Sequence, residues 1–162
     1  MIRLCLAISL ILAPAMAAQA QDSAQISRVQ SGQSCSGCNL FQADLSYLDL
    51  PGIDVSGARL RQADLSLATM NGARFDNANL SVANLFGARF TGASFRNANL
   101  SNSVMVGTYL GSADMSGANL AGANLSGAEM ETSRGLTQAQ LNSACGDNST
   151  RLPAGLVISY CP

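Results

Sequence analysis

The sequence contains no histidine, lysine or tryptophan, and all nine of its basic residues are arginine. The missing histidine excludes a histidine-based catalytic triad and a metal site with histidine ligands. Charged residues make up only 12% of the 162 residues, and the formal net charge is −1 at pH 7. Such a chain gives no reason to expect binding to nucleic acid or to an anionic membrane. Because acid–base groups are scarce, we predict that the protein is not an enzyme and holds no cofactor or metal.

The central part of the chain repeats with a period of five residues, as in the stretch GANLAGANLSGAEM from Gly117 to Met130. A large apolar residue, the centre of each repeat, falls on every multiple of five from Leu40 to Met130. Alanine usually stands two positions before the centre, and glycine often stands two positions after it. Neither the 3.6-residue period of a helix nor the two-residue period of a strand gathers every fifth residue on one face. The chain must therefore turn a corner in each repeat, so that all centres face one axis.

The side chains at the centres indicate how many repeats form one coil. A spacing of fifteen residues mixes leucine, valine and methionine, whereas a spacing of twenty aligns identical side chains: Leu40, Leu60, Leu80, Leu100 and Leu120, and also Phe75 and Phe95. We therefore predict a solenoid with four repeats per coil and a square cross-section. Nearly five coils would form a rod roughly 23 Å long at the strand spacing of about 4.8 Å.

The repeat A-[DN]-L-S-G, seen here as ADLS, ANLS and ANLAG, resembles the pentapeptide-repeat family from Cys38 to about Thr132. The resemblance implies an all-β fold, a right-handed quadrilateral β-helix. It is much less specific for function, because the repeated residues form the core. Many members have no known role, and the best-known members mimic DNA and shield DNA gyrase from drugs and toxins.

A DNA-mimicking protector of a type II topoisomerase is therefore one alternative function. A mimic needs a dense acidic surface in place of phosphates. Without Arg3, which lies in the predicted signal peptide, eight arginines stand against ten acidic residues, a charge of only −2. Gyrase is also cytoplasmic, whereas residues 1–20 of this chain have the pattern of an export signal, so the sequence disfavours this alternative.

The first twenty residues have the pattern of a secretory signal peptide. Arg3 precedes an apolar run from Leu4 to Ala13 that is too short to span a bilayer, and Ala18-Gln19-Ala20 fits a cleavage site. We predict a signal peptide at 1–20 and an exported protein, periplasmic or secreted from a bacterium. A retained membrane anchor is the alternative, which the short apolar run disfavours. No stable membrane anchor is expected after cleavage.

The remaining chain divides into three parts. Residues 21–34 lack the five-residue register and are predicted to form a polar leader, residues 35–132 form the solenoid, and residues 133–162 form a C-terminal cap. A short helix is predicted in the cap, because Thr137 and Gln140 fit a capping box and Leu136 with Leu141 fits a hydrophobic staple. Such a helix would cover the open edge of the last coil.

Four cysteines follow the signal peptide, and they allow three disulfide pairings: Cys35, Cys38, Cys145 and Cys161. The first two lie at the start of the solenoid and the last two follow its end. A rod of roughly 23 Å separates the ends, whereas a disulfide needs Cα atoms within about 7 Å. The predicted pairs are therefore Cys35–Cys38 and Cys145–Cys161, and the same separation disfavours a zinc site with four cysteine ligands.

The stretch CSGC at Cys35 to Cys38 is also a CxxC motif, so a weak thiol-redox protein is a further alternative function. Redox-active CxxC motifs usually place the first cysteine at the start of a helix, where its thiolate is stabilised. Here the motif leads into a β coil, so we favour a structural disulfide.

If the repeat is structural, function is expected where outward positions depart from it. On the face of the centres Leu45 to Leu125, apolar residues replace the usual Ser, Gly, Asp or Asn at six outward positions: Tyr47, Leu67, Val82, Phe86, Val104 and Val106. We predict that they form one apolar strip that contacts a protein partner or a second copy of the chain. In the alternative interpretation these side chains fold over the corners and expose little area. The main functional hypothesis is a non-catalytic exported scaffold for protein interactions.

Overall fold

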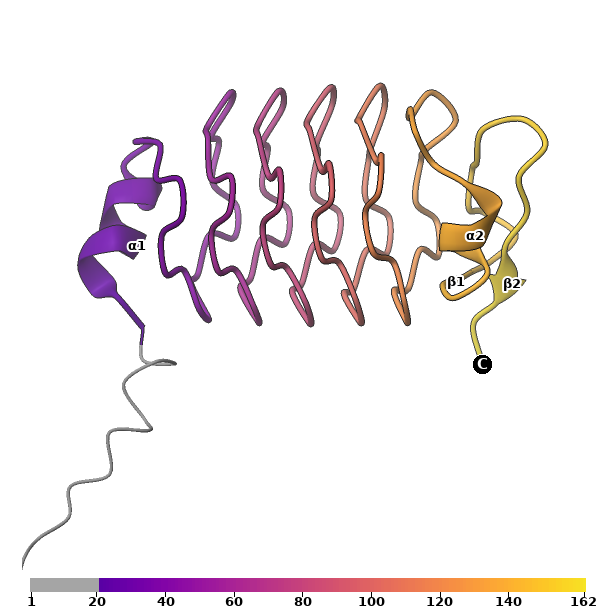
Figure 1. Ribbon diagram of the computed structural model, residues 1–162, viewed down its shortest axis with the longest axis horizontal. Coiled ribbons are helices and arrows are strands. Elements are labelled where there is room, and N and C mark those ends of the chain that lie inside the picture. The colour runs from indigo at the N-terminus through magenta and orange to yellow at the C-terminus, as the bar shows by residue number, and fades with distance from the viewer. Residues whose placement is uncertain (1–20) are drawn as a thin grey trace, which may run out of the picture.

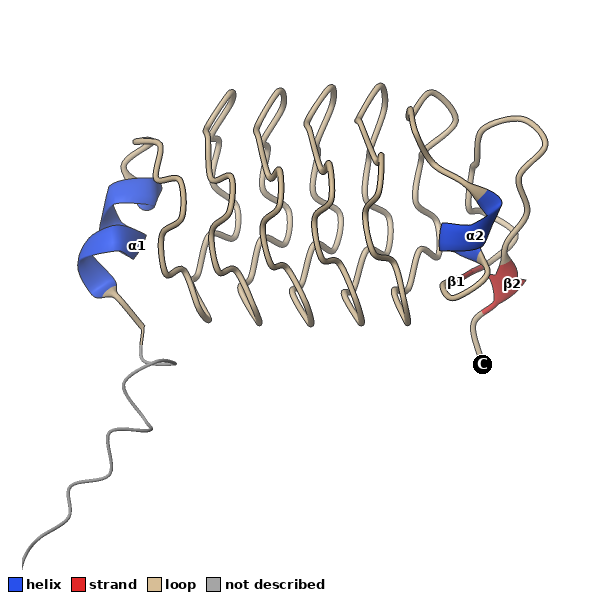
Figure 2. Ribbon diagram, in the orientation of Figure 1, coloured by secondary structure: helices blue, strands red, loops and turns tan. Residues whose placement is uncertain are grey.

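The computed structural model of the protein describes residues 21–162, and the predicted signal peptide lies outside these described residues. The described chain is a straight stack of coils with a short helix at each end (Figure 1). Its regular elements are helix α1 at Ser23–Gln30, helix α2 at Gln138–Leu141, and the paired parallel strands β1 at Cys145–Gly146 and β2 at Ser159–Tyr160. Figure 2 draws the coils between the helices as loop, because each pairing segment is a single residue long.

Neighbouring coils are joined by a parallel ladder. The residue before each centre pairs with the residue twenty positions later, as in Asp44 with Asp64. This spacing corresponds to four pentapeptides per coil. Towards the C-terminus the spacing lengthens, so that Asn124 pairs with Cys145 and Glu129 with Arg151. One added residue lies between Arg134 and Cys145, in the segment that contains α2, and the other lies between Cys145 and Arg151.

The core consists of the predicted centres. Every centre from Leu40 to Met130 is at most 5% exposed, which confirms the register read from the sequence. The rings of Phe75 and Phe95 stack with centroids 4.8 Å apart, and Phe90 meets both rings edge-on at 5.6 and 5.2 Å. Such geometries suit the aromatic quadrupole and add to the free energy of burial.

The corners of the coils are tight turns in which one residue has a positive φ. In one of them the carbonyl of Leu65 accepts a hydrogen bond from the amide of Ala68 at 3.1 Å, and Leu67 between them has φ 57°. A hydrogen bond across four residues with a positive φ at the third is the geometry of a type II turn. Glycine or asparagine is favoured at that third position, because other residues meet a steric clash there. This explains why glycine so often stands two positions after a centre.

The predicted polar leader contains helix α1, which the sequence analysis missed. The carboxylate of Asp22 caps its first turn by accepting from the amide of Gln25 at 3.1 Å. Val29 is completely buried against the core of the stack, and Ile26 is partly buried there. The core contacts of α1 come from Ile26 and Val29, and two apolar residues are too few to produce a readable helical period in this polar segment.

Side chains of α1 also bond the open edge of the first coil. Gln25 Oε1 accepts from the amide of Asn39 at 2.6 Å, and Gln30 Nε2 donates to the carbonyl of Asp44 at 2.8 Å. An unpaired sheet edge would otherwise present free amides and carbonyls to other chains. The helix is therefore attached to the stack by polar contacts as well as by Val29.

At the other end, helix α2 begins with the predicted capping box. Thr137 Oγ1 accepts from the amide of Gln140 at 3.4 Å, and Gln140 Oε1 accepts from the amide of Thr137 at 2.8 Å. Gln140 Nε2 also donates to the carbonyls of Met115 and Ala118, each at 2.9 Å. Leu141 is fully buried. Within residues 21–162, no helix combines the length and the apolar character needed to cross a membrane.

Candidate functional site

The six residues of the apolar strip lie on successive coils, along one face of the rod and its two edges. Backbone hydrogen bonds join them in a ladder: the amide of Leu67 donates to the carbonyl of Phe86 at 2.8 Å, and that of Gly87 donates to Val106 at 2.9 Å. Val106 is half-buried, and the exposed fractions of the others are Tyr47 75%, Leu67 42%, Val82 46%, Phe86 48% and Val104 42%. Between about two fifths and three quarters of each of these five residues is therefore exposed to solvent.

Three residues of the strip also have a strained backbone. Tyr47, Leu67 and Val82 have φ of 59°, 57° and 59° at the third position of their turns. The other non-glycine residues with positive φ in the described chain are all polar: Gln42, Gln62, Asn77, Asn97, Asn102 and Ser112. An ordinary L-residue in this region is destabilised by about 1–2 kcal/mol. The strip thus combines two unfavourable features, exposed apolar side chains and left-handed backbone, at the same positions.

This combination has no explanation in the stability of the coil. Glycine or asparagine at these three corners would remove the clash and the exposed apolar surface together. Strained backbone conformations that persist in a structure concentrate at binding and catalytic sites. Because the other corners with positive φ carry glycine or a polar residue, the coincidence of this backbone with exposed apolar side chains marks the strip as the candidate site.

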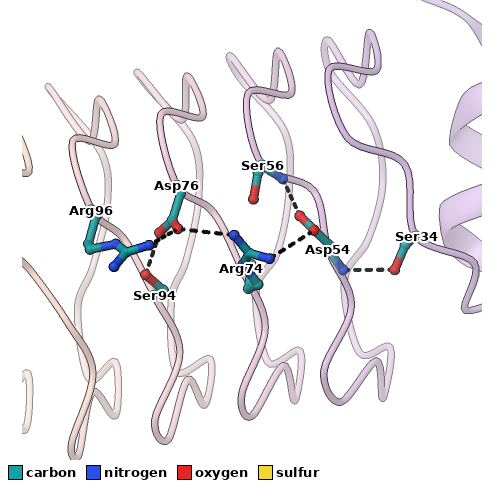
Figure 3. A network of polar contacts seen from close by, with 7 residues as sticks. All are labelled: Ser34, Asp54, Ser56, Arg74, Asp76, Ser94 and Arg96. Carbon is teal, nitrogen blue, oxygen red and sulfur yellow. Dashed lines mark hydrogen bonds and ion pairs between the residues drawn. The ribbon is translucent and has the colours of Figure 1, made fainter.

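A second cluster, of charged residues, flanks the centres Val55, Phe75 and Phe95, which follow those of the strip by ten residues, or two faces of a four-sided coil. Figure 3 shows these charged residues on neighbouring coils. Asp76 is 5% exposed and accepts hydrogen bonds from the hydroxyl of Ser94 and from Arg96 Nη2, the latter at 2.8 Å. Arg74 lies between two carboxylates, with Nη1 3.5 Å from Asp54 Oδ2 and Nη2 3.5 Å from Asp76 Oδ2. These ion pairs connect three neighbouring coils.

The surroundings of Asp76 and Asp54 favour their charged forms. Burial alone would raise the pKa of Asp76, but the hydrogen bonds from Ser94 and Arg96 and the charge of Arg96 outweigh it and hold this pKa below its usual value. Hydrogen bonds from the side chain and the amide of Ser56 likewise lower the pKa of Asp54. Both carboxylates are thus ionised at neutral pH and act as acceptors within the network.

The charged cluster borders an open pocket of about 270 Å³ lined by Arg74, Asp76, Ser94, Arg96, Asp114 and Arg134. Its acidic and basic groups alternate, and the Ser94 hydroxyl donates to Asp76, a carboxylate that also pairs with Arg74 and Arg96. Throughout residues 21–162 there is also no group of three or more His, Cys, Asp or Glu side chains that could hold a metal ion. The cluster is best described as a network that links the coils.

The four predicted cysteines form two disulfides at opposite ends of the rod, Cys35–Cys38 and Cys145–Cys161. Cys35 is 4% exposed, and helix α1 ends before it, so no helix begins at the CxxC motif. The second bridge joins β1 to the end of the chain, directly after β2. Both disulfides connect backbone segments that lie outside the apolar strip.

The profile of the family described as pentapeptide repeats matches eight copies over residues 31–62, 38–77, 63–102 and 93–131. The chain belongs to the pentapeptide-repeat family. Members of this family fold as right-handed quadrilateral β-helices, in agreement with the twenty-residue ladder. A search among curated protein sequences gave no match.

Several solved structures are similar to this pentapeptide-repeat protein. A pentapeptide repeat protein from the thylakoid lumen of Arabidopsis thaliana is 31% identical, with a TM-score of 0.60, over 75% of this chain and 83% of that chain. A second, from Nostoc PCC 7120, is 25% identical with a TM-score of 0.45, over 85% and 88% of the two chains. QnrB1, a plasmid-mediated fluoroquinolone resistance protein, is 22% identical with a TM-score of 0.35, over 70% of each chain. The two lower similarities carry no functional assignment.

Sequence reasoning named the residues of the strip but missed two features of the surface. The backbone strain follows from the turn geometry, which only the folded corner displays. The charged cluster could have been found, because Asp54 with Arg74 and Asp76 with Arg96 are opposite charges at the spacing of one coil.

Proposed function

We propose that this protein is a non-catalytic, exported scaffold that binds another protein through the apolar strip. The observation that carries the proposal is the coincidence of exposure and strain at Tyr47, Leu67 and Val82. At each position the residue is worse for the isolated fold than the glycine or asparagine used at other corners. A contact surface provides the missing benefit, because burial against a partner recovers the free energy of the exposed apolar area.

The rest of the molecule suits a rigid support for such a surface. Ladder hydrogen bonds join every coil to the next, and the centres form one continuous core. Helices α1 and α2 act in this proposal as end caps, since their side chains bond the coil edges at Asn39, Met115 and Ala118. The outward residues are thereby held at fixed spacing, which lowers the entropy lost on binding.

Export is part of the proposal. It rests on the signal-like pattern of residues 1–20 and on two disulfides, which persist in oxidising compartments outside the cytoplasm. The similar Arabidopsis protein is from the thylakoid lumen, which agrees with a non-cytoplasmic location. N-terminal sequencing of the protein recovered from the periplasm or medium should begin near Gln21. Recovery of the full-length chain from the cytoplasm alone would contradict export.

The size of the strip sets the expected affinity. Burying about 400 Å² of apolar surface contributes on the order of 10 kcal/mol before other terms. Association itself costs about 4–15 kcal/mol in lost freedom of motion. The strip alone therefore supports moderate or weak binding, or part of a larger interface.

A photo-reactive residue at Leu67, introduced into the exported protein in living cells, tests the contact surface. The matched control is Asn97, which occupies the same turn position with φ 54° on another face. We expect a protein adduct at position 67 and none at position 97. Equal adduct yields at both positions would contradict the proposal. In a second test the photo-reactive residue replaces Tyr47, and Leu67→Arg and Val106→Arg are added to the same chain. Adducts that these two substitutions leave unchanged would also contradict the proposal.

The described surface does not favour the alternative functions. The acidic groups of the charged cluster alternate with arginines, whereas a DNA mimic needs continuous negative rows. A redox role needs an accessible first cysteine at a helix start, whereas Cys35 is buried and follows α1.

A further inference from the structure

We propose that the strip binds a second copy of this chain, with the two rods antiparallel and related by a two-fold axis perpendicular to them. This inference rests on the proposed function, because it names the partner of the same strip. It is carried by the order in which large and small residues follow one another along the edge of the rod.

Two columns of residues run along this edge, each with one member per coil. The outer column, two residues after the centres, reads Tyr47, Leu67, Gly87 and Gly107. The inner column, one residue after the centres, reads Ser46, Ser66, Phe86 and Val106. The outer column thus has large side chains on its first two coils and glycine on the next two. The inner column has small side chains on its first two coils and larger ones on the next two.

A two-fold axis between the second and third of these coils brings each column against its own reverse. Tyr47 then faces Gly107 of the second copy and Ser46 faces Val106, while near the axis Leu67 faces Gly87 and Phe86 faces Ser66. Large residues therefore meet small ones in both columns at once. This self-complementarity is what a two-fold interface requires, because each contact must occur twice.

The two glycines of the outer column differ in whether the space beside them is free. A Cβ placed on Gly87 would lie 2.7 Å from Leu67 Cδ2, so the Leu67 side chain already lies over this glycine. A Cβ placed on Gly107 would have no atom within 4 Å beyond its chain neighbours. Gly107 thus leaves open space beside Val106, which we call the hollow, and Tyr47, at 75% exposed, is the most exposed residue of the strip. The axis pairs this protrusion with this hollow.

Other arrangements fit less well. Parallel rods in the same register would place Tyr47 against Tyr47 and glycine against glycine. In the antiparallel arrangement the two acidic residues on this face, Asp44 and Asp64, lie opposite Val104 and Asn84 of the second copy, so no like charges meet. An interface of about 400 Å² per copy is small beside the roughly 800 Å² of a standard interface, so the dimer should be weak and reversible.

Two single variants test the contact without disturbing the fold. Tyr47→Asn removes the protrusion, and Gly107→Asn fills the hollow. Both place asparagine at a corner with positive φ, where Asn77, Asn97 and Asn102 already occur in this chain. Gly92→Asn is the matched control, because it has the same turn position and the same open space on another face.

Sedimentation of the mature protein from about 10 µM to about 1 mM should show a monomer–dimer equilibrium. Tyr47→Asn and Gly107→Asn should each weaken dimerisation at least about tenfold, and Gly92→Asn should leave it unchanged. A mixture of the first two variants should form a heterodimer, because one chain keeps the hollow and the other keeps the tyrosine. In a separate experiment on the otherwise unchanged protein, a photo-reactive residue at position 47 should crosslink to residues 104–107 of the second copy.

The outcomes separate this inference from the proposed function. A protein that stays monomeric to about 1 mM, or a dimer that all three variants leave unchanged, would overturn the two-fold arrangement. If the probe at Leu67 still captured a different protein, the scaffold proposal would stand without it. Absence of both the dimer and the adduct would overturn the two together.

Discussion

Asp76 should stabilise the rod in a pH-dependent way. Its carboxylate is 5% exposed, accepts from Ser94 and Arg96, and lies 3.5 Å from Arg74 Nη2. A hydrogen bond to a charged group contributes about 1.5–3 kcal/mol, and the partly exposed arginines are screened by water and contribute less. Asp76→Asn keeps the size of the side chain but loses the charge, so we expect the free energy of unfolding at pH 7 to fall by about 1–2 kcal/mol.

The sign of the pH effect follows from the lowered pKa. A carboxylate whose folded pKa lies below its unfolded value stabilises the protein above the unfolded pKa of about 4. This stabilisation is lost as the pH falls through the folded value. The difference between the natural protein and Asp76→Asn should therefore shrink on acidification from pH 7 to about pH 2.5.

Urea unfolding at a series of pH values measures this difference directly. Asp49→Asn is the control, because Asp49 is exposed and lies outside the ion pairs that Arg74 and Arg96 form with Asp54 and Asp76. A stability difference for Asp76→Asn that stays constant between pH 7 and pH 2.5 would refute the reasoning, since it would show that the charge of Asp76 contributes nothing.

Three further predictions concern the core and the two ends of the rod. Phe95→Ala should lower the free energy of unfolding by about 3–5 kcal/mol, because it removes a fully buried ring that contacts two others; a loss below about 1 kcal/mol in urea unfolding would contradict this. Val29→Ser should speed amide exchange in the first coil by loosening α1, whereas the exposed control Arg28→Ala should not; equal exchange in both would show that α1 does not protect the edge. Replacing Cys145 and Cys161 by serine opens a loop with a sequence separation of 16 and should reduce stability by about 3 kcal/mol, measured by thermal unfolding; an unchanged midpoint would contradict the estimate.

Some features of the fold could be predicted because they depend on neighbours in the chain. The five-residue period identified every buried centre, since only a chain that turns in each repeat can bury residues at that spacing. The matching leucines twenty residues apart indicated the coil size, and Thr137 with Gln140 predicted the start of α2. Each of these signals lies within a short stretch or repeats many times, so it can be read without coordinates of distant residues.

Other features depend on contacts between segments that are distant in sequence. Helix α1 is held by Val29 in the core and by Gln25 on the amide of Asn39, and neither contact has a local pattern. The burial of Asp76 depends on Ser94 and Arg96, which arrive one coil later.

The sequence by itself determined the repeat, the core and the identity of the apolar residues that interrupt the outward pattern. Only the tertiary structure decided that three of them, Tyr47, Leu67 and Val82, lie at positive φ and that the hollow at Gly107 is open. The physical reason is that side-chain type is a property of the chain, whereas backbone strain and exposure arise when successive coils are stacked and their corners are forced to turn.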